Sequence, residues 1–230
     1  MPAPEPTIGG APRTDAELSE FLMRACHDLR GPLRTVRIHA ELLARKGGAE
    51  SDESRAFVTN GAATAGAVLD GIADYALALA IDRSRFRATP LDVIVRTAIA
   101  KLSAQIHEIE AEISYDDLPS VQGDADRLLQ LFEYLVDHSL RGHGPNRLSI
   151  RISADRQDGA WLFAVRDNGA GLPAESLAKA FTPFTRLHGN QRPGPGLAVC
   201  RAIVERHGGL MWGESMPGSG CVFWFTLPGE

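Results

Sequence analysis

The sequence has few cysteines and no long uninterrupted apolar run. Its cysteines, Cys26, Cys200 and Cys221, are odd in number and lack the spacing of a metal site. We therefore expect reduced, buried thiols, as in a cytoplasmic protein, and no disulfide framework. No segment reaches the roughly 18 consecutive apolar residues of a membrane-spanning helix, so we expect none to cross a membrane.

An excess of charge of one sign is also missing. The formal net charge is −5 over 230 residues, which argues against nucleic acid as the main partner. The apolar content of 44% is enough for a sizeable core in one large or two small domains. Residues 1–13 are rich in proline, glycine and alanine, and we expect a disordered tail there instead of a signal peptide.

A helical pattern begins at Thr14 and continues to Lys46, where Gly47 and Gly48 end it. Its apolar residues recur at steps of four and three, as at a seam between packed helices. This first seam comprises Leu22, Cys26, Leu29, Leu33, Val36, Ala40 and Leu43.

A second helical pattern follows from Ser51 to about Ile81. Its seam comprises Val58, Gly61, Ala65, Val68, Ile72, Tyr75 and Leu79. Residues 14–82 thus predict an antiparallel helical hairpin. Because one hairpin buries little of two apolar seams, we expect two copies to pair as a four-helix bundle in a homodimer. The alternative is a hairpin that packs only against the rest of its own chain.

His27 lies one residue past the first seam, where its ring can face solvent, and Asp28 follows it. Pro32 leaves the Asp28 carbonyl without its helical partner, so the helix can bend beside the histidine. An imidazole is a nucleophile near neutral pH, and a neighbouring carboxylate can fix its tautomer and accept its proton. The pair indicates a phospho-accepting histidine; the alternative is an ordinary surface histidine.

Residues 90–230 mix helical and strand patterns after a short polar connection. Helices are expected over Leu91–Gln105, Ala125–Leu140, Ser176–Ala180 and Pro195–His207. Strands are expected over Glu112–Tyr115, Leu148–Ala154, Trp161–Val165, Leu210–Glu214 and Cys221–Leu227. The predicted fold class is α+β: the helical hairpin, then an α/β sandwich with a mixed, mostly antiparallel sheet.

Two glycine-containing turns are candidate ligand sites. Asp167 ends a strand before Gly169 and Gly171, which permit close backbone approach to a ligand. A carboxylate there can accept a hydrogen bond from an exocyclic amine such as that of adenine. Gly194 and Gly196 precede a helix, whose free N–H groups favour phosphate. Taken alone, either segment could be a plain turn.

In this order the segments resemble the boxes of sensor histidine kinases. His27–Leu33 resembles the H-box of a HisKA-type hairpin, and Leu131–Arg141 stands at the N-box. Asp167–Gly171, Phe181–Phe184 and Gly194–Ala198 resemble the G1, F and G2 boxes of a GHKL ATPase domain. The resemblance covers about residues 17–228.

The resemblance implies an ATP- and Mg²⁺-dependent autokinase. Adenine would lie against Asp167, and the phosphates near Gly194, Gly196 and Leu197. The γ-phosphoryl group would pass to His27 with Asp28 as general base, and then to an aspartate of a response regulator. With about a dozen residues before the hairpin, a separate sensor protein would supply the signal.

Three departures from the family pattern put ATP use in doubt. Tyr134 and His138 replace the two asparagines of the N-box, and His138 occupies the expected Mg²⁺-ligand position although Mg²⁺ prefers oxygen. Arg192 stands where a glycine belongs in a shortened ATP lid. Gly31 replaces the residue that orients water for phosphatase action. The alternative function is a phosphotransferase or pseudokinase that relays phosphoryl groups between response regulators, and a third possibility is a structural adaptor.

Overall fold

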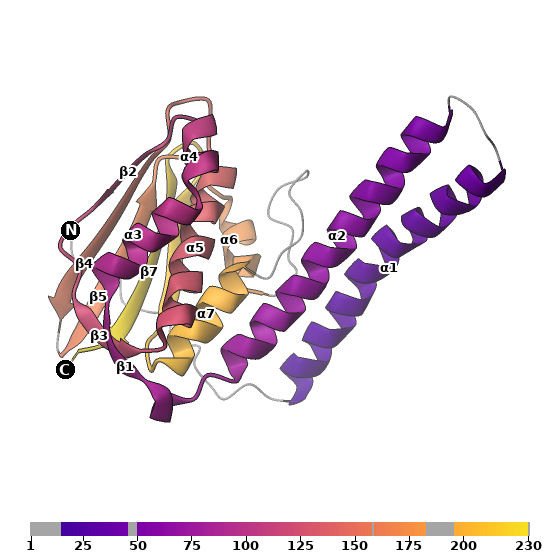
Figure 1. The fold of residues 1–230 in the computed structure, drawn as a ribbon. Helices are drawn as coiled ribbons and strands as arrows, with labels where there is room; N and C mark the ends of the chain where they lie inside the picture. The colour runs from indigo at the N-terminus through magenta and orange to yellow at the C-terminus, as the bar shows by residue number, and fades with distance from the viewer. Residues whose placement is uncertain (1–14, 46–49, 158, 183–195, 230) are drawn as a thin grey trace.

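The computed structural model describes residues 15–45, 50–157, 159–182 and 196–229 (Figure 1). Two long helices lie side by side, next to a sheet that carries helices on one face. The second long helix contacts the helical layer of the sheet domain through α7, Gly196–Arg206.

Helices α1, Asp15–Arg45, and α2, Glu50–Leu79, pack antiparallel. A Cβ atom on Gly61 would lie 2.8 Å from Val36 Cγ2 and 3.1 Å from the Pro32 carbonyl oxygen, so the glycine permits the close approach of the two helices. One turn along, the rings of His39 and Phe57 stack with their centroids 4.3 Å apart.

The buried stripe of α2 follows the predicted seam at Ala65, Val68 and Tyr75. The buried stripe of α1 is shifted by one position from the predicted seam. Ala25 is buried, whereas Cys26 and Leu33 are exposed in the single chain, so the expected burial of the Cys26 thiol is not seen. α2 covers only one narrow stripe of α1, and cover of the remaining seam by a second helical pair stays a prediction.

The other two thiols are buried as predicted, those of Cys200 and Cys221. Burial raises the pKa of both thiols, which keeps them protonated and unreactive.

By length and composition alone, one described helix segment, Glu53–Leu79 within α2, could cross a membrane. This finding differs from the expectation that no segment is sufficiently apolar. The apolarity of this segment comes from its alanines together with leucine, valine and isoleucine.

A short linker joins α2 to the sheet domain. In the 3-10 turn Arg83–Arg85, Arg83 Nε donates to the Arg206 carbonyl at 2.7 Å, at the end of α7. Next, β1, Arg87–Pro90, pairs antiparallel with β3, Ser120–Gly123. The sequence predicted only a polar connection and a break for these segments. Each strand has four residues, too few to show an alternating pattern, and the pairing joins segments some thirty residues apart.

The main sheet has the strand order β2-β4-β5-β7-β6. Its strands are β2 (Glu112–Tyr115), β4 (Ser149–Gln157), β5 (Ala160–Asp167), β6 (Met211–Met216) and β7 (Gly220–Pro228). Only β2 and β4 run parallel; the other neighbours are antiparallel. The prediction of a mixed, mostly antiparallel sheet is confirmed.

The described helices of this domain lie on one face of the sheet (Figure 1). They are α3 (Leu91–Lys101), α4 (Ser103–Glu108), α5 (Ala125–Arg141), α6 (Ala174–Ala180) and α7 (Gly196–Arg206). The expected single helix at 91–105 is interrupted at Leu102. Asp124 caps α5 and accepts from the N–H groups of Asp126 and Arg127 at 3.1 Å each.

Aromatic rings fill the layer between α5 and the sheet. Phe163 and Phe225 stack with their centroids 4.8 Å apart, and Phe132 of α5 meets Phe225 edge-on at 5.9 Å. All three side chains are fully buried, so they anchor the sheet to α5.

His207 ties the end of α7 to the start of α5. Its Nε2 accepts from the Asp124 N–H at 3.0 Å, so its Nδ1, 2.8 Å from the Ile203 carbonyl oxygen, carries the proton and donates. Phe86 of the linker stacks on the ring with a centroid separation of 4.5 Å. Burial lowers the pKa of His207 because the charged ring would lose its hydration.

Candidate functional site

His27 presents its imidazole to solvent beside a half-buried acid. Its side chain is 86% exposed, and its Nδ1 lies 3.2 Å from Asp28 Oδ1. Asp28 is only 14% exposed and therefore less mobile than a surface acid. With Nδ1 donating to the carboxylate, Nε2 keeps the lone pair that can attack an electrophile.

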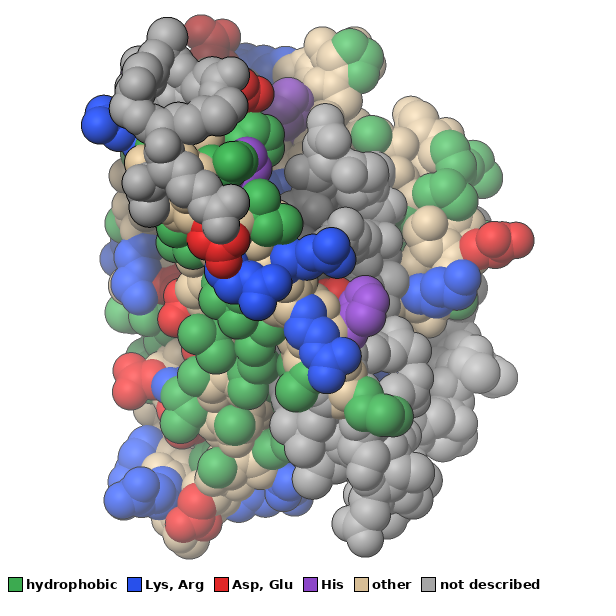
Figure 2. All heavy atoms as spheres, turned by 90° about the vertical axis from the view of Figure 1, so that its right-hand side faces the viewer, with side chains coloured by type: hydrophobic (Ala, Val, Ile, Leu, Met, Phe, Trp, Pro, Cys, Tyr) green, Lys and Arg blue, Asp and Glu red, His purple; other side chains and the backbone are tan. Residues whose placement is uncertain are grey.

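Basic side chains continue along the same side of α1. Arg30, Arg34 and Arg37 follow His27 at steps of three, four and three, which places them on one helical face, and all three are exposed. Figure 2 shows basic side chains gathered near the middle of the face that carries the helical pair, with an apolar patch beside them. The sequence analysis missed this basic stripe, although the spacing alone could have revealed it.

Asp167 lies at the end of β5 in a cradle of hydrogen-bond donors. Its Oδ1 accepts from the backbone N–H groups of Gly169 at 2.9 Å and Cys221 at 3.1 Å, and its Oδ2 accepts from the Ser139 hydroxyl at 3.0 Å. The carboxylate is therefore fixed by three segments that are far apart in sequence. Ser139 was not predicted as a site residue, and its place one position past the N-box histidine was the available signal.

The glycines around Asp167 permit close backbone contacts. A Cβ atom on Gly169 would lie 2.5 Å from the Gly142 carbonyl oxygen. Gly171 has φ +69°, and its Cβ would lie 2.1 Å from the Met216 carbonyl oxygen. Gly220, which was not predicted, has φ +84° and would place a Cβ 2.0 Å from the Asp167 carbonyl oxygen. The turn after β5 and the turn before β7 thus pack directly on each other.

Tyr134 joins this domain to the helical pair. Its hydroxyl donates to Asp74 Oδ2 on α2. Burial, together with this carboxylate, raises the pKa of Tyr134, so the phenol stays protonated. A Cβ atom on Gly196, the first residue of α7, would lie 3.4 Å from the tyrosine ring. The N-box tyrosine therefore lies between α2 and the start of α7.

The remaining predicted phosphate-site residues are partly described. Leu197 is buried, in the first turn of α7. Gly194, Arg192 and the shortened lid lie outside the described residues.

The side chains at the expected magnesium position do not fit this ion. Mg²⁺ prefers several oxygen ligands in octahedral geometry. The His138 ring stands edge-on to Phe223, with centroids 5.0 Å apart. The nearby carboxylates of Glu133 and Asp137 are paired with Lys101 and Arg141 respectively. Among the described residues, no group of three or more histidines, cysteines or acids could hold a metal ion. His138 as a metal ligand therefore stays a prediction.

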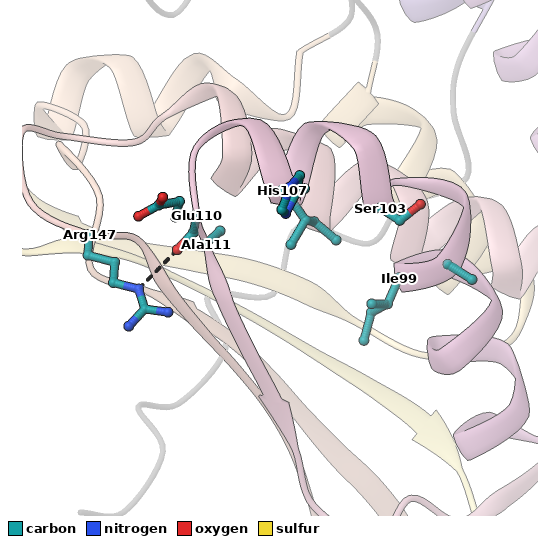
Figure 3. A pocket seen from close by; sticks show the side chains of 8 residues that line it. Ile99, Ser103, His107, Glu110, Ala111 and Arg147 are labelled. Atoms are coloured by element: carbon teal, nitrogen blue, oxygen red, sulfur yellow. Dashed lines mark hydrogen bonds between the residues drawn. The ribbon is translucent and has the colours of Figure 1, made fainter.

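A separate cavity of about 430 Å³ lies by α3, α4 and the start of β2 (Figure 3). Arg147 forms one side of it and donates from Nε to the Glu110 carbonyl oxygen at 3.0 Å. None of the predicted site residues lines this cavity, so it is distinct from the Asp167 cradle.

Comparison with known families gives a match in the second half of the chain. Residues 123–230 match the model of histidine kinase-, DNA gyrase B- and HSP90-like ATPases. Among relatives, the phytochrome-like protein Cph1 of Synechocystis sp. is 35% identical over 94% of this chain, which spans 30% of Cph1. The adaptive-response sensory kinase SasA of Prochlorococcus marinus is 37% identical over 53% of this chain, with 33% of SasA covered. The chain thus spans about a third of the length of these relatives.

Solved structures share the architecture. The catalytic domain of histidine kinase ThkA is 25% identical with a TM-score of 0.54, over 63% of this chain and 95% of that one. ThkA in complex with the response regulator TrrA has a TM-score of 0.71 at 21% identity, covering 94% and 63%. Full-length ShkA in complex with AMPPNP has a TM-score of 0.62 at 21% identity, covering 91% and 45%. The last two likenesses concern the fold alone.

Proposed function

We propose that this chain, whose residues 123–230 match the model of histidine kinase-, DNA gyrase B- and HSP90-like ATPases, is a two-component histidine kinase. In this proposal His27 is phosphorylated from ATP, and the phosphoryl group then passes to an aspartate of a response regulator. The observation that carries the proposal is the exposed His27 imidazole, held through Nδ1 by Asp28 and joined to an ATPase-family domain.

The chemistry at His27 is nucleophilic attack by Nε2 on the γ-phosphorus of ATP. The N–P bond forms as the bond to the β,γ-bridging oxygen breaks, and ADP leaves. Asp28 accepts the Nδ1 proton, so the phosphorylated ring stays neutral and reactive towards a second acceptor. Arg30, Arg34 and Arg37 offset the charge of the phosphoryl group on the same helical face.

Adenine recognition is assigned to the Asp167 cradle. A carboxylate accepts from an exocyclic amine, and the glycine turns leave room for a planar ring near the backbone. Support also comes from the shared fold of ShkA, which was solved with AMPPNP.

The acceptor of the phosphoryl group is proposed to be a response regulator, by analogy with the ThkA–TrrA complex. The basic stripe of α1 suits the acidic phosphorylation pocket of such a partner. Exposed apolar side chains beside it would add contact area, among them Met23, Ile38 and Leu42.

A second candidate function is phosphotransfer without productive use of ATP. Two observations favour it: the Tyr134 hydroxyl is engaged with Asp74, and the side chains at the N-box do not suit Mg²⁺. In that case His27 would be charged by a phosphorylated receiver domain and would pass the group to another.

The deciding experiment is autophosphorylation with γ-labelled ATP in Mg²⁺ and, in parallel, in Mn²⁺. We expect acid-labile label on the intact chain and none on His27→Gln, which keeps a polar side chain but lacks the nucleophile. Asp167→Ala should lose label together with nucleotide binding. Label that survives in His27→Gln would exclude this residue as the acceptor.

A separate experiment tests phosphotransfer without use of ATP. If the intact chain binds no ATP and takes up no label, it is mixed with a receiver domain carrying labelled phosphate. Transfer to the intact chain but not to His27→Gln would establish the phosphotransferase. Absence of label in both arms would leave neither function standing. Tyr134→Asn, which restores the family residue, should raise ATP-dependent labelling if the tyrosine is what impairs the kinase.

A further inference from the structure

The cavity beside α3, α4 and β2 combines an apolar wall with a charged end (Figure 3). Its volume of about 430 Å³ lies in the range of small-molecule sites. None of the residues assigned to the proposed kinase chemistry lines it. We call this cavity the α4 pocket, and its lining residues are Ile99, Ala100, Ser103, Ile106, His107, Glu110, Ala111 and Arg147.

The wall of the α4 pocket is apolar. Ile99 of α3, Ile106 of α4 and Ala111 before β2 pack against the core of the domain, yet each of them is only half-buried. Part of their remaining surface lines the cavity. A ligand that covers this surface removes it from water, which stabilises the complex by about 25 cal/mol per Å². The wall therefore favours a ligand with a large apolar group.

One end of the pocket carries two opposite charges, those of Glu110 and Arg147 (Figure 3). Arg147 Nε donates to the Glu110 carbonyl oxygen at 3.0 Å, which keeps the two residues adjacent. In the described part of the chain, the one carboxylate near the guanidinium is that of Glu112, whose Oε2 lies 3.8 Å from Nη1. This distance is too long for a hydrogen bond. Nη1 and Nη2 can therefore donate together to a ligand carboxylate.

The backbone fixes Glu110 at the rim of the pocket. Glu110 has φ +51°, and no other non-glycine residue that the structure describes has a positive φ. The chain reverses there after α4, and the Ala111 N–H donates to the Ile106 carbonyl at 2.9 Å. Glycine or asparagine is usual at such a position, because a left-handed residue with a side chain costs about 1 kcal/mol. A glutamate in this place indicates a use for its carboxylate.

The two charges together select a zwitterion. A simple anion would be attracted by Arg147 and repelled by Glu110, and a simple cation would meet the reverse. A molecule that carries an ammonium and a carboxylate on one carbon is attracted by both side chains. The Ser103 hydroxyl and the His107 ring add groups that can form hydrogen bonds on the same rim.

We propose that the α4 pocket binds a free α-amino acid with a large apolar side chain. The carboxylate of the ligand lies on Arg147, its ammonium group on Glu110 and its side chain on the apolar wall. The site is separate from the proposed kinase function and does not depend on it. Binding would make the stability of this end of the domain depend on the concentration of the amino acid.

The test is a titration of the full chain with L-phenylalanine, followed by NMR of the isoleucine methyl groups. We expect the methyl signals of Ile99 and Ile106 to shift on binding. Ile203, fully buried on α7, is the internal control and should not shift. Two related molecules, 3-phenylpropionate without the ammonium and 2-phenylethylamine without the carboxylate, should each bind about fivefold more weakly.

Variants of the charged end separate the two contacts. Glu110→Gln keeps the size of the side chain and removes its charge, so it should weaken L-phenylalanine about fivefold without weakening 3-phenylpropionate. Arg147→Gln should weaken both molecules. Glu108→Gln is the matched control, since Glu108 ends α4 but does not line the pocket, and it should bind like the intact chain.

Three outcomes would overturn the proposal. The first is the absence of methyl shifts at L-phenylalanine concentrations up to about 10 mM. The second is equal binding of L-phenylalanine and 3-phenylpropionate, and the third is equal binding of L-phenylalanine to the intact chain and to Glu110→Gln, because the ammonium would then go unrecognised. None of these measurements uses ATP, so their result is independent of whether the chain is a kinase.

Discussion

Asp167 is the residue at which three segments of the ATPase-family domain meet. The sequence placed Asp167, Gly169 and Gly171 in one turn, and the structure brings them to a common cradle. Ser139 and Gly220 were not predicted because they lie in α5 and at the start of β7. A local sequence pattern does not predict a contact between residues so far apart in the chain. Residues within a single turn could be predicted, and the partners that tertiary packing supplies could not.

The two glycines of the turn before β7 offer a matched pair of substitutions. Gly218 has φ +78° with no atom within 4 Å of its missing Cβ, whereas Gly220 combines φ +84° with a close contact to the Asp167 carbonyl. We expect Gly218→Ala to cost about 1 kcal/mol, the penalty of a left-handed residue. Gly220→Ala should cost about 3 kcal/mol or more, because backbone must also move. Urea unfolding measures the loss of unfolding free energy in each variant. Equal losses in the two variants would show that the contact at Gly220 adds no cost.

His207 predicts a pH dependence of stability. Its pKa is lowered in the folded state from the usual 6.5 because burial removes the hydration of the charged ring, and the hydrogen bond to the Ile203 carbonyl offsets only part of this effect. Above pH 6.5 the ring is neutral in both states and its contribution is complete. As the pH falls below that value the unfolded state binds the proton first, so the free energy of unfolding decreases.

The measurement is the urea midpoint of the chain at several pH values between 7.5 and 5. His207→Gln should lower the midpoint at pH 7.5 and reduce its fall towards pH 5. The remaining histidines are common to both proteins, so the difference between the two profiles reports on His207. If the midpoints of the two proteins fell in parallel with pH, His207 would not be the source of the pH dependence.

At the scale of elements, periodicity identified the long helices and the main strands well. Periodicity did not predict the features that depend on tertiary packing. Cys26 and Leu33 belong to a seam that a second helical pair would cover, so a single chain leaves them exposed. β1 and β3 were missed because both contain turn-like polar residues and are specified by their pairing with each other.

The contact of α5 with α2 predicts an energetic coupling. Tyr134→Phe and Asp74→Ala each remove the hydrogen bond between the Tyr134 hydroxyl and the Asp74 carboxylate. We expect each change to destabilise the chain by about 1–2 kcal/mol. The double variant should lose less than the sum, with a coupling energy of about 1 kcal/mol. Strictly additive losses would mean that the two side chains do not interact in solution. Tyr75→Phe, the adjacent buried tyrosine of α2, serves as a control for loss of a hydroxyl elsewhere.

At the scale of the whole molecule, large apolar side chains of the helical pair are exposed. Leu33 on α1 and Leu69 and Leu77 on α2 are 54%, 56% and 51% exposed. We predict that a second copy covers these side chains, as expected for a four-helix bundle.

Light scattering after gel filtration measures the mass directly. The intact chain should elute as a homodimer at micromolar concentration, and Leu69→Glu with Leu77→Glu should give a folded monomer. Val93→Glu is the matched control, since Val93 is 49% exposed but lies on α3, away from the helical pair. A monomeric intact chain would rule out the bundle.

The strand order β2-β4-β5-β7-β6 has a consequence for biosynthesis. The last strand to leave the ribosome, β7, is not at an edge but between β5 and β6, and its first residues supply the Cys221 N–H to Asp167. A nascent chain therefore cannot complete the sheet or the Asp167 cradle until the residues of β7 have left the ribosome. Premature termination before Gly220 would leave β6 without its neighbour, so we expect a shortened product to be degraded.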